Sequence, residues 1–159
     1  MFVKKFYTDV FLLLIAITLF LPACDTDLGE DDGKQTTYSL SGNANGANER
    51  PNPVTTAATG TIAGTYDDNT NMLNYTITWT GLSGPPIAMH FHGPADRNTP
   101  AGVVIPIPLP SNPAAAGSVT GSATLTAQQE TELLSELWYY NIHTDLNQGG
   151  EIRGQVVAR

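Results

Sequence analysis

The stretch that decides the fold is WYYNIHTDLNQGGEIRGQVV, residues 138–157. Apolar and polar residues alternate on both sides of its central segment, DLNQGG. Because successive side chains of a strand point to opposite faces, this alternation predicts two strands, each with one apolar and one polar face. The central segment is short and ends in glycine, as a hairpin connection does. We therefore expect the two strands to be neighbours in one sheet.

The polar faces of these two strands carry several functional groups. Asn141 and His143 share one face of the first strand, and Glu151 and Arg153 share one face of the second. We expect Glu151 and Arg153, two residues apart, to form an ion pair, with Asn141 as a cross-strand hydrogen-bond partner. This polar cluster favours a structural role over contact with a ligand. His143 has two carboxylates as alternative partners, Glu151 and Asp145.

A second stretch, MHFHGPA (89–95), holds the other two of the three histidines in the chain. Alternation sends His90 and His92 to the face opposite their apolar neighbours, about 6 to 7 Å apart along the strand. If this strand lies beside that of His143, three imidazoles can reach one ion. Three nitrogen ligands with an open fourth position are typical of catalytic zinc sites, and imidazole also suits copper.

His90, His92 and His143 are therefore candidate ligands of a copper or zinc ion. A second interpretation stays open, in which each histidine hydrogen-bonds to backbone or to a carboxylate at the edge of the sheet and no ion is bound. The sequence does not separate the two.

The rest of the chain after residue 35 alternates short β-prone runs with clusters of Gly, Pro, Asn and Asp, which is typical of an all-β sandwich or barrel. The expected strands are 37–44, 59–66, 72–80, 87–92, 103–107, 118–125, 138–144 and 151–158. The segment DDNTN (67–71) predicts a hairpin turn. One short helix, 127–137, is expected before the penultimate strand, because Thr126 and Gln129 have capping-box spacing.

The N-terminal residues 1–23 have the pattern of a secretory signal peptide. Lys4 and Lys5 precede a continuous apolar stretch, 10–21. A membrane-spanning helix needs about 20 apolar residues, so this shorter stretch favours a signal peptide over a membrane anchor.

The segment Leu21-Pro22-Ala23-Cys24 resembles a bacterial lipobox, in which the cysteine becomes the lipidated first residue of the mature protein. An ordinary signal peptide followed by an unpaired cysteine is the alternative, but lipidation accounts for the lone thiol. Residues 24–35 are expected to form an acidic, solvated tether, and an acidic run behind such a cysteine resembles the surface-export signals of some bacterial lipoproteins. We therefore expect a lipid anchor on Cys24 that holds the protein outside the cytoplasm, on the cell envelope, at the outer membrane or the cell surface.

The charge balance argues against nucleic acid as a partner. The chain has a formal net charge of -8 at pH 7, and its few basic residues are scattered along the sequence. Binding to phosphate backbones requires clustered lysine and arginine. The expected partner is a protein or a glycan, and the loops 93–102 and 108–117 are candidate contact surfaces.

Several motifs, in order, resemble those of CHRD domains, the modules named after chordin. The segments MHFHGPA, YYNIHT and GGEIRGQV resemble the family motifs HIHGPA, YVNIHT and GEIRGQ. The upstream text from Leu40 to Tyr66 and the helix before YYNIHT resemble the family as well, so the resemblance covers residues 38–158. Two departures are Phe91, where isoleucine is usual, and Asn52, which interrupts a usual pair of prolines.

This resemblance implies an extracellular, immunoglobulin-like β-domain and names a module without naming a reaction. We expect residues 36–159 to form a Greek-key β-sandwich that acts as a binding or interaction module without catalysis. The alternative is a small mononuclear copper or zinc enzyme related to superoxide dismutase, with Arg153 guiding an anion. A bimetallic site of that kind needs about six histidines, twice the number present, and analogy of fold is weak support for function.

Overall fold

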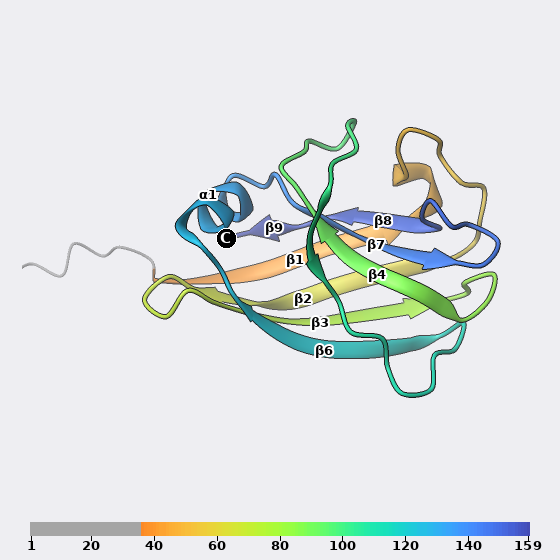
Figure 1. The fold of residues 1–159 in the computed structure, drawn as a ribbon, viewed down its shortest axis with the longest axis horizontal. Coiled ribbons are helices and arrows are strands. Elements are labelled where there is room, and N and C mark those ends of the chain that lie inside the picture. The colour runs from red at the N-terminus through yellow and green to blue at the C-terminus, as the bar shows by residue number, and fades with distance from the viewer. Residues whose placement is uncertain (1–35) are drawn as a thin grey trace, which may run out of the picture. The chain divides into compact units, whose positions relative to one another are not determined.

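Nine antiparallel strands form one continuous sheet in residues 36–159, the part of the chain that the computed structural model describes (Figure 1). The elements are β1 (Thr37–Asn45), η1 (Gly46–Asn48), β2 (Thr59–Asp67), β3 (Met72–Thr80), β4 (Pro86–His92), β5 (Val103–Pro106), β6 (Gly117–Thr124), α1 (Ala127–Leu134), β7 (Tyr139–Thr144), β8 (Ile152–Gln155) and β9 (Val157–Ala158). The expected signal peptide, Cys24 and the expected tether lie outside the described residues.

The all-β prediction is confirmed, with one short helix before β7 as expected. The helix ends at Leu134 rather than at residue 137, because Glu136 adopts a left-handed φ of 57° that a helix cannot continue. The expected last strand is divided at Val156, which is fully buried and donates its N–H to Trp138 O. No helix among residues 36–159 is long and apolar enough to cross a membrane.

The sheet curls so that its two halves face each other with their apolar sides inward. The strand order is β5-β4-β7-β8-β1-β2-β3-β6, with β9 paired to β1. The two halves meet along a narrow seam, where Asn45 pairs with Arg153 and the Leu40–Ser41 segment pairs with β9. The two layers expected of a sandwich are therefore parts of one sheet.

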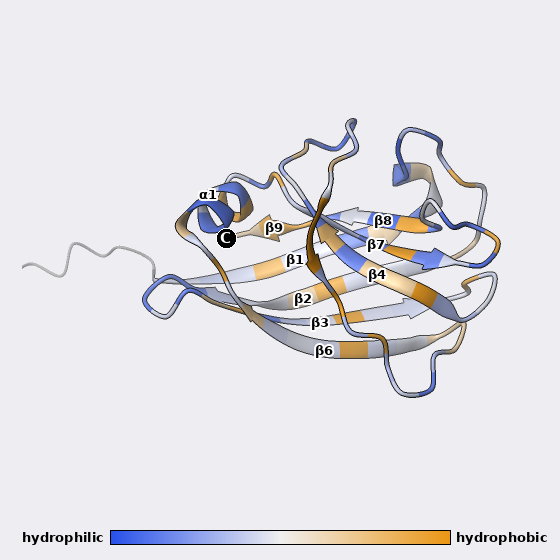
Figure 2. Cartoon of the chain, in the orientation of Figure 1, coloured by the Kyte–Doolittle hydropathy of each residue, from blue (hydrophilic) through white to orange (hydrophobic). Residues whose placement is uncertain are grey.

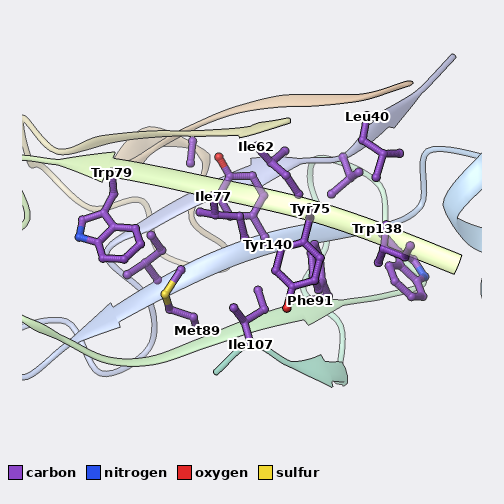
Figure 3. Packing of buried hydrophobic residues seen from close by; sticks show 14 of the residues in the cluster. Leu40, Ile62, Tyr75, Ile77, Trp79, Met89, Phe91, Ile107, Trp138 and Tyr140 are labelled. Atoms are coloured by element: carbon purple, nitrogen blue, oxygen red, sulfur yellow. The ribbon is translucent and has the colours of Figure 1, made fainter. Parts of the chain in front are cut away.

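The core lies between the two halves of the sheet (Figure 3). Tyr75 from β3 points toward Phe91 from β4, and their rings meet edge to face at a centroid distance of 5.0 Å. Phe91 also contacts the fully buried Trp138 at 6.0 Å. Such aromatic pairs add attraction beyond the hydrophobic burial of each ring.

Local signals in the sequence account for the connections that were expected. The β2–β3 hairpin turns at residues 68–71, where Asp67 Oδ1 accepts hydrogen bonds from the N–H groups of Asn69 and Thr70. Asn71 adopts the left-handed φ of 56° that asparagine tolerates. Thr126 and Gln129 form the expected capping box of α1.

Candidate metal site and polar face

The strands that carry the histidines and the Glu-Arg motif are neighbours. In the register, His90 of β4 lies opposite Asn141 of β7, and Asn141 lies opposite Arg153 of β8. Along β4 and β8, hydrophilic and hydrophobic residues follow one another closely (Figure 2). We call the surface opposite the core the polar face; its residues are His90, His92, Tyr139, Asn141, His143, Glu151, Arg153 and Gln155.

The polar face is largely buried. Asn141, Glu151 and Arg153 retain 3%, 0% and 1% of their exposure. Three loops cover the polar face. They provide hydrogen-bond partners such as Thr56 for Glu151, Asp96 for Arg153 and Gln148 for His143. Nothing in the alternation of the strands indicated this cover, because the loops of Thr56 and Asp96 are distant in sequence from the residues that they cover.

The three histidines converge at one edge of the polar face. His90 Nδ1 lies 3.2 Å from His143 Nε2. His90, His92 and His143 each present one ring nitrogen, and these three nitrogens all lie within 4.8 Å of one another. His90 is partly exposed, while His92 and His143 are buried, so the cluster is reached from solvent beside His90.

Backbone carbonyls hold two of the rings in place. His143 Nδ1 lies 2.9 Å from Gln148 O, which can only accept, so the bond places the proton on Nδ1 and leaves the lone pair of Nε2 facing His90. His92 Nδ1 lies 3.0 Å from Ala101 O, and its Nε2 lies 3.0 Å from Asn141 Oδ1; both oxygens can only accept, so the neutral ring donates to one of them at a time. Carbonyl bonds of this kind orient metal-binding histidines in known sites.

Burial favours the neutral form of all three imidazoles. Loss of hydration lowers the pKa of His90, His92 and His143 below the ordinary value of 6.5. The neighbouring histidines lower the pKa of His90 and His143 further, since two charged rings so close would repel. Neutral imidazole is the form that binds a metal ion.

The spacing of the cluster fits a metal ion with little movement. A zinc ion lies about 2.0–2.1 Å from each imidazole nitrogen, so two tetrahedral ligands are roughly 3.3 Å apart. The 3.2 Å between His90 Nδ1 and His143 Nε2 is close to that separation. The other separations in the set are within 4.8 Å, so the third ring would move closer to complete the site.

A stack of side chains continues from the histidines across the polar face. The rings of His92 and Tyr139 are parallel, with centroids 4.8 Å apart. The guanidinium carbon of Arg153 lies 3.5 Å from the centroid of the same Tyr139 ring. Since β4 and β8 flank β7, the two groups approach Tyr139 from opposite sides, and the cation is held by the ring face.

The expected ion pair between Glu151 and Arg153 does not form. Glu151 instead accepts hydrogen bonds from Thr56 Oγ1, Ser83 Oγ and Thr144 Oγ1, at 2.9, 2.6 and 2.7 Å. Burial raises the pKa of Glu151, but the hydrogen bonds outweigh burial and leave the pKa below its usual range. The prediction was wrong because loop residues provide other partners for both side chains. Thr56 and Ser83 donate to the Glu151 carboxylate, and Arg153 donates to Asp96 O.

Sequence reasoning also missed Glu49, a buried acid beside this face. Its side chain is 3% exposed, and burial raises its pKa to about 7, against the opposing effect of Arg153. Glu49 and Asn141 both approach Gly150, whose φ of 122° and missing side chain leave room for them. No local motif marks Glu49, because its surroundings come from other parts of the chain.

Residues 36–159 thus define an all-β domain whose buried polar face presents three converging histidines. The family described as CHRD domain matches residues 40–156. Because the match covers most of the chain, the protein belongs to the CHRD domain family, whose domains are generally extracellular. Neither a curated protein nor a solved structure matches the chain significantly.

Proposed function

We propose that this protein is an extracytoplasmic binding module of the CHRD type that holds one copper or zinc ion through His90, His92 and His143. The observation that carries the proposal is the set of three ring nitrogens within 4.8 Å of one another. Three imidazoles on adjacent strands leave at least one coordination position for water or for a partner's side chain.

The electrostatics of the cluster are compatible with metal binding. Lowered pKa values mean that few protons must be displaced at neutral pH. The His90–His143 contact places two basic nitrogens face to face. In the absence of an ion, one of those nitrogens must carry the proton that joins them.

Metal uptake by the separate domain tests the proposal. All residues of the described core lie between Leu40 and Val156, so residues 34–159 carry a complete core and can be produced alone. We expect the domain, dialysed against excess Cu²⁺ or Zn²⁺, to retain one ion per chain by elemental analysis. His92→Ala should lose that ion, whereas Asp145→Asn, an exposed acid next to the cluster in sequence, should retain it.

Two outcomes would count against the metal site. One is less than one ion per chain under saturating conditions, and the other is full retention in His92→Ala. Addition of superoxide to the copper-loaded domain then separates a binding module from an enzyme: a binding module leaves the spontaneous decay of superoxide unchanged.

We further propose that Cys24 carries a lipid that attaches the module to the cell envelope. The support is the segment Leu21-Pro22-Ala23-Cys24 and the acidic stretch after it. Expression of the full chain in a bacterial host with radiolabelled palmitate should label the wild type and not Cys24→Ala. A labelled Cys24→Ala variant would contradict the anchor.

A further inference from the structure

The described part of the chain is poor in cations, yet most of its cations meet in one place. Residues 36–159 contain four arginines and no lysine. Three of them, Arg50, Arg97 and Arg153, line a pocket of about 250 Å³. The other lining residues, Asn48, Asn98 and Gln155, are also polar, and no carboxylate or large apolar side chain lines the pocket. The scattered bases of the sequence are therefore clustered in space.

Arg153 forms the buried floor of this pocket. It is 1% exposed, donates from Nη2 to Asp96 O at 2.8 Å and stacks on Tyr139. Its Nη1 is buried and has no hydrogen-bond acceptor among the described residues. A charged N–H group buried without an acceptor is unfavourable, and an anionic oxygen that reached Nη1 through a small movement of the Arg153 side chain would supply that acceptor.

The other two arginines complete a positive wall. Arg50 Nη1 donates to Ala47 O and Glu49 O, at 2.9 and 2.8 Å, which fixes its guanidinium group at the pocket. Arg97 is exposed and makes no hydrogen bond or ion pair with residues 36–159. It is therefore free to close on a ligand. Arginine is suited to this task, because its planar group binds oxyanions through paired hydrogen bonds.

A second hollow, of about 440 Å³, adjoins the arginine pocket and shares Asn48, Arg97 and Gln155 with it. Its further lining includes the polar side chains of Ser41, Asn43 and Asn45, from the outer face of β1. Amide groups both donate and accept hydrogen bonds, as the hydroxyl groups of a sugar do. Neither hollow offers an aromatic side chain on which a nucleobase could stack.

We propose that these adjoining hollows bind an acidic saccharide, with its anionic group at Arg50, Arg97 and Arg153 and its hydroxyl groups along the asparagines of β1 and η1. This inference deepens the proposed role as a binding module by naming a class of ligand. It does not depend on the metal, because the arginine pocket contains none of the three histidines.

Titration of the metal-free domain with glucuronate and with glucose tests the inference, because the two sugars share a ring and differ in one carboxylate. We expect glucuronate to shift the backbone amide signals of Asn48, Arg97 and Gln155 in ¹H–¹⁵N spectra, and glucose to leave them unchanged. Arg97→Gln should raise the dissociation constant for glucuronate about tenfold or more. The matched control is Arg159→Gln, which removes the one described arginine outside the pocket and should bind as the wild type does.

Three results would overturn the inference. Equal shifts with glucose and glucuronate would mean that the arginines do not bind the carboxylate of glucuronate. Unchanged affinity in Arg97→Gln would place the ligand elsewhere. Inorganic sulfate binding as tightly as glucuronate would reduce the pocket to a simple anion site. The titration is run with a chelator present, so its failure leaves the metal proposal standing, and loss of metal uptake leaves this one standing.

Discussion

His90 and His143 bring Nδ1 and Nε2 to 3.2 Å although 53 residues separate them in sequence. The contact is diagonal, because Ala88, and not His90, lies opposite His143 in the β4–β7 register. A slip of one residue between these strands would turn both histidines of β4 toward the core. The geometry of the histidine cluster therefore depends on the register between β4 and β7.

The first prediction concerns the protonation of the cluster. In the metal-free domain we expect all three imidazoles to titrate below pH 6.5, because burial lowers the pKa of each. Between the folded and unfolded pKa values the unfolded chain binds more protons, so the histidine contribution to the free energy of unfolding decreases as the pH falls below 6.5. Histidine NMR signals followed against pH provide the measurement, and a midpoint above 6.5 for any ring would contradict the prediction.

The second prediction concerns Glu49, whose pKa is raised from 4.5 to about 7. Between these values the folded chain holds the extra proton, so this residue makes the free energy of unfolding decrease as the pH rises. Glu49→Gln removes that contribution. We expect the free energy of unfolding of the variant, relative to that of the wild type, to increase by about 3 kcal/mol from pH 4.5 to pH 7.

Urea unfolding at several pH values measures this difference in slope. The control is Asp145→Asn, an exposed acid, whose unfolding free energy should run parallel to that of the wild type. Parallel curves for Glu49→Gln and the wild type would show that Glu49 ionises normally in the folded protein.

The third prediction concerns Glu151, which joins the loop residues Thr56 and Ser83 to Thr144 of β7. Glu151→Gln replaces a charged acceptor with a group that meets the same donors less well. We expect a loss of about 2–4 kcal/mol in the free energy of unfolding at pH 7, because hydrogen bonds to buried charges are strong. Because the pKa of Glu151 is lowered in the folded protein, protonation removes this stabilisation, and the advantage of the wild type over Glu151→Gln is lost as the pH falls below about 4.5. A loss under 1 kcal/mol in urea unfolding at pH 7 would be inconsistent with this role.

The fourth prediction concerns the contact of Phe91 with Tyr75 between the two halves of the sheet. Phe91→Ile introduces the residue usual at this position in the motif that the chain resembles. It removes the edge-to-face contact, so we expect a loss of about 1.5 kcal/mol in the free energy of unfolding. Ile87→Val, at a position of the same strand that is 43% exposed, should change it by less than about 0.5 kcal/mol. Equal effects of the two substitutions would show that the ring contact contributes little.

Much of the fold was predictable, because its signals are local. Alternation fixed the strands, the turn residues before Asn71 marked the β2–β3 hairpin, and Thr126 with Gln129 marked the helix start. Alternation also indicated that His90 and His92 share a face, since the side-chain period of a strand is two.

The pairings that complete the sites were not predictable from one sequence. The pairing of β4 with β7 joins segments about 50 residues apart in sequence, and the core contacts of Phe91 with Tyr75 and Trp138 also come from other parts of the chain, so no local pattern indicates them. Likewise, Arg50 and Arg97 belong to separate loops and share a pocket only because those loops cover the same face. The expected Glu151–Arg153 pair failed for the same reason, as loop hydroxyl groups took the carboxylate.

The seam between the two halves of the sheet has a consequence for the order of assembly. Strand β1, near the start of the domain, is joined to the other half by Arg153 and by residues 157–158. Within the domain, the segments synthesised last, β8 and β9, are thus the ones that join the two halves of the sheet. Until β8 and β9 have been synthesised, β1 has β2 as its one neighbour, and the two halves of the sheet stay unjoined.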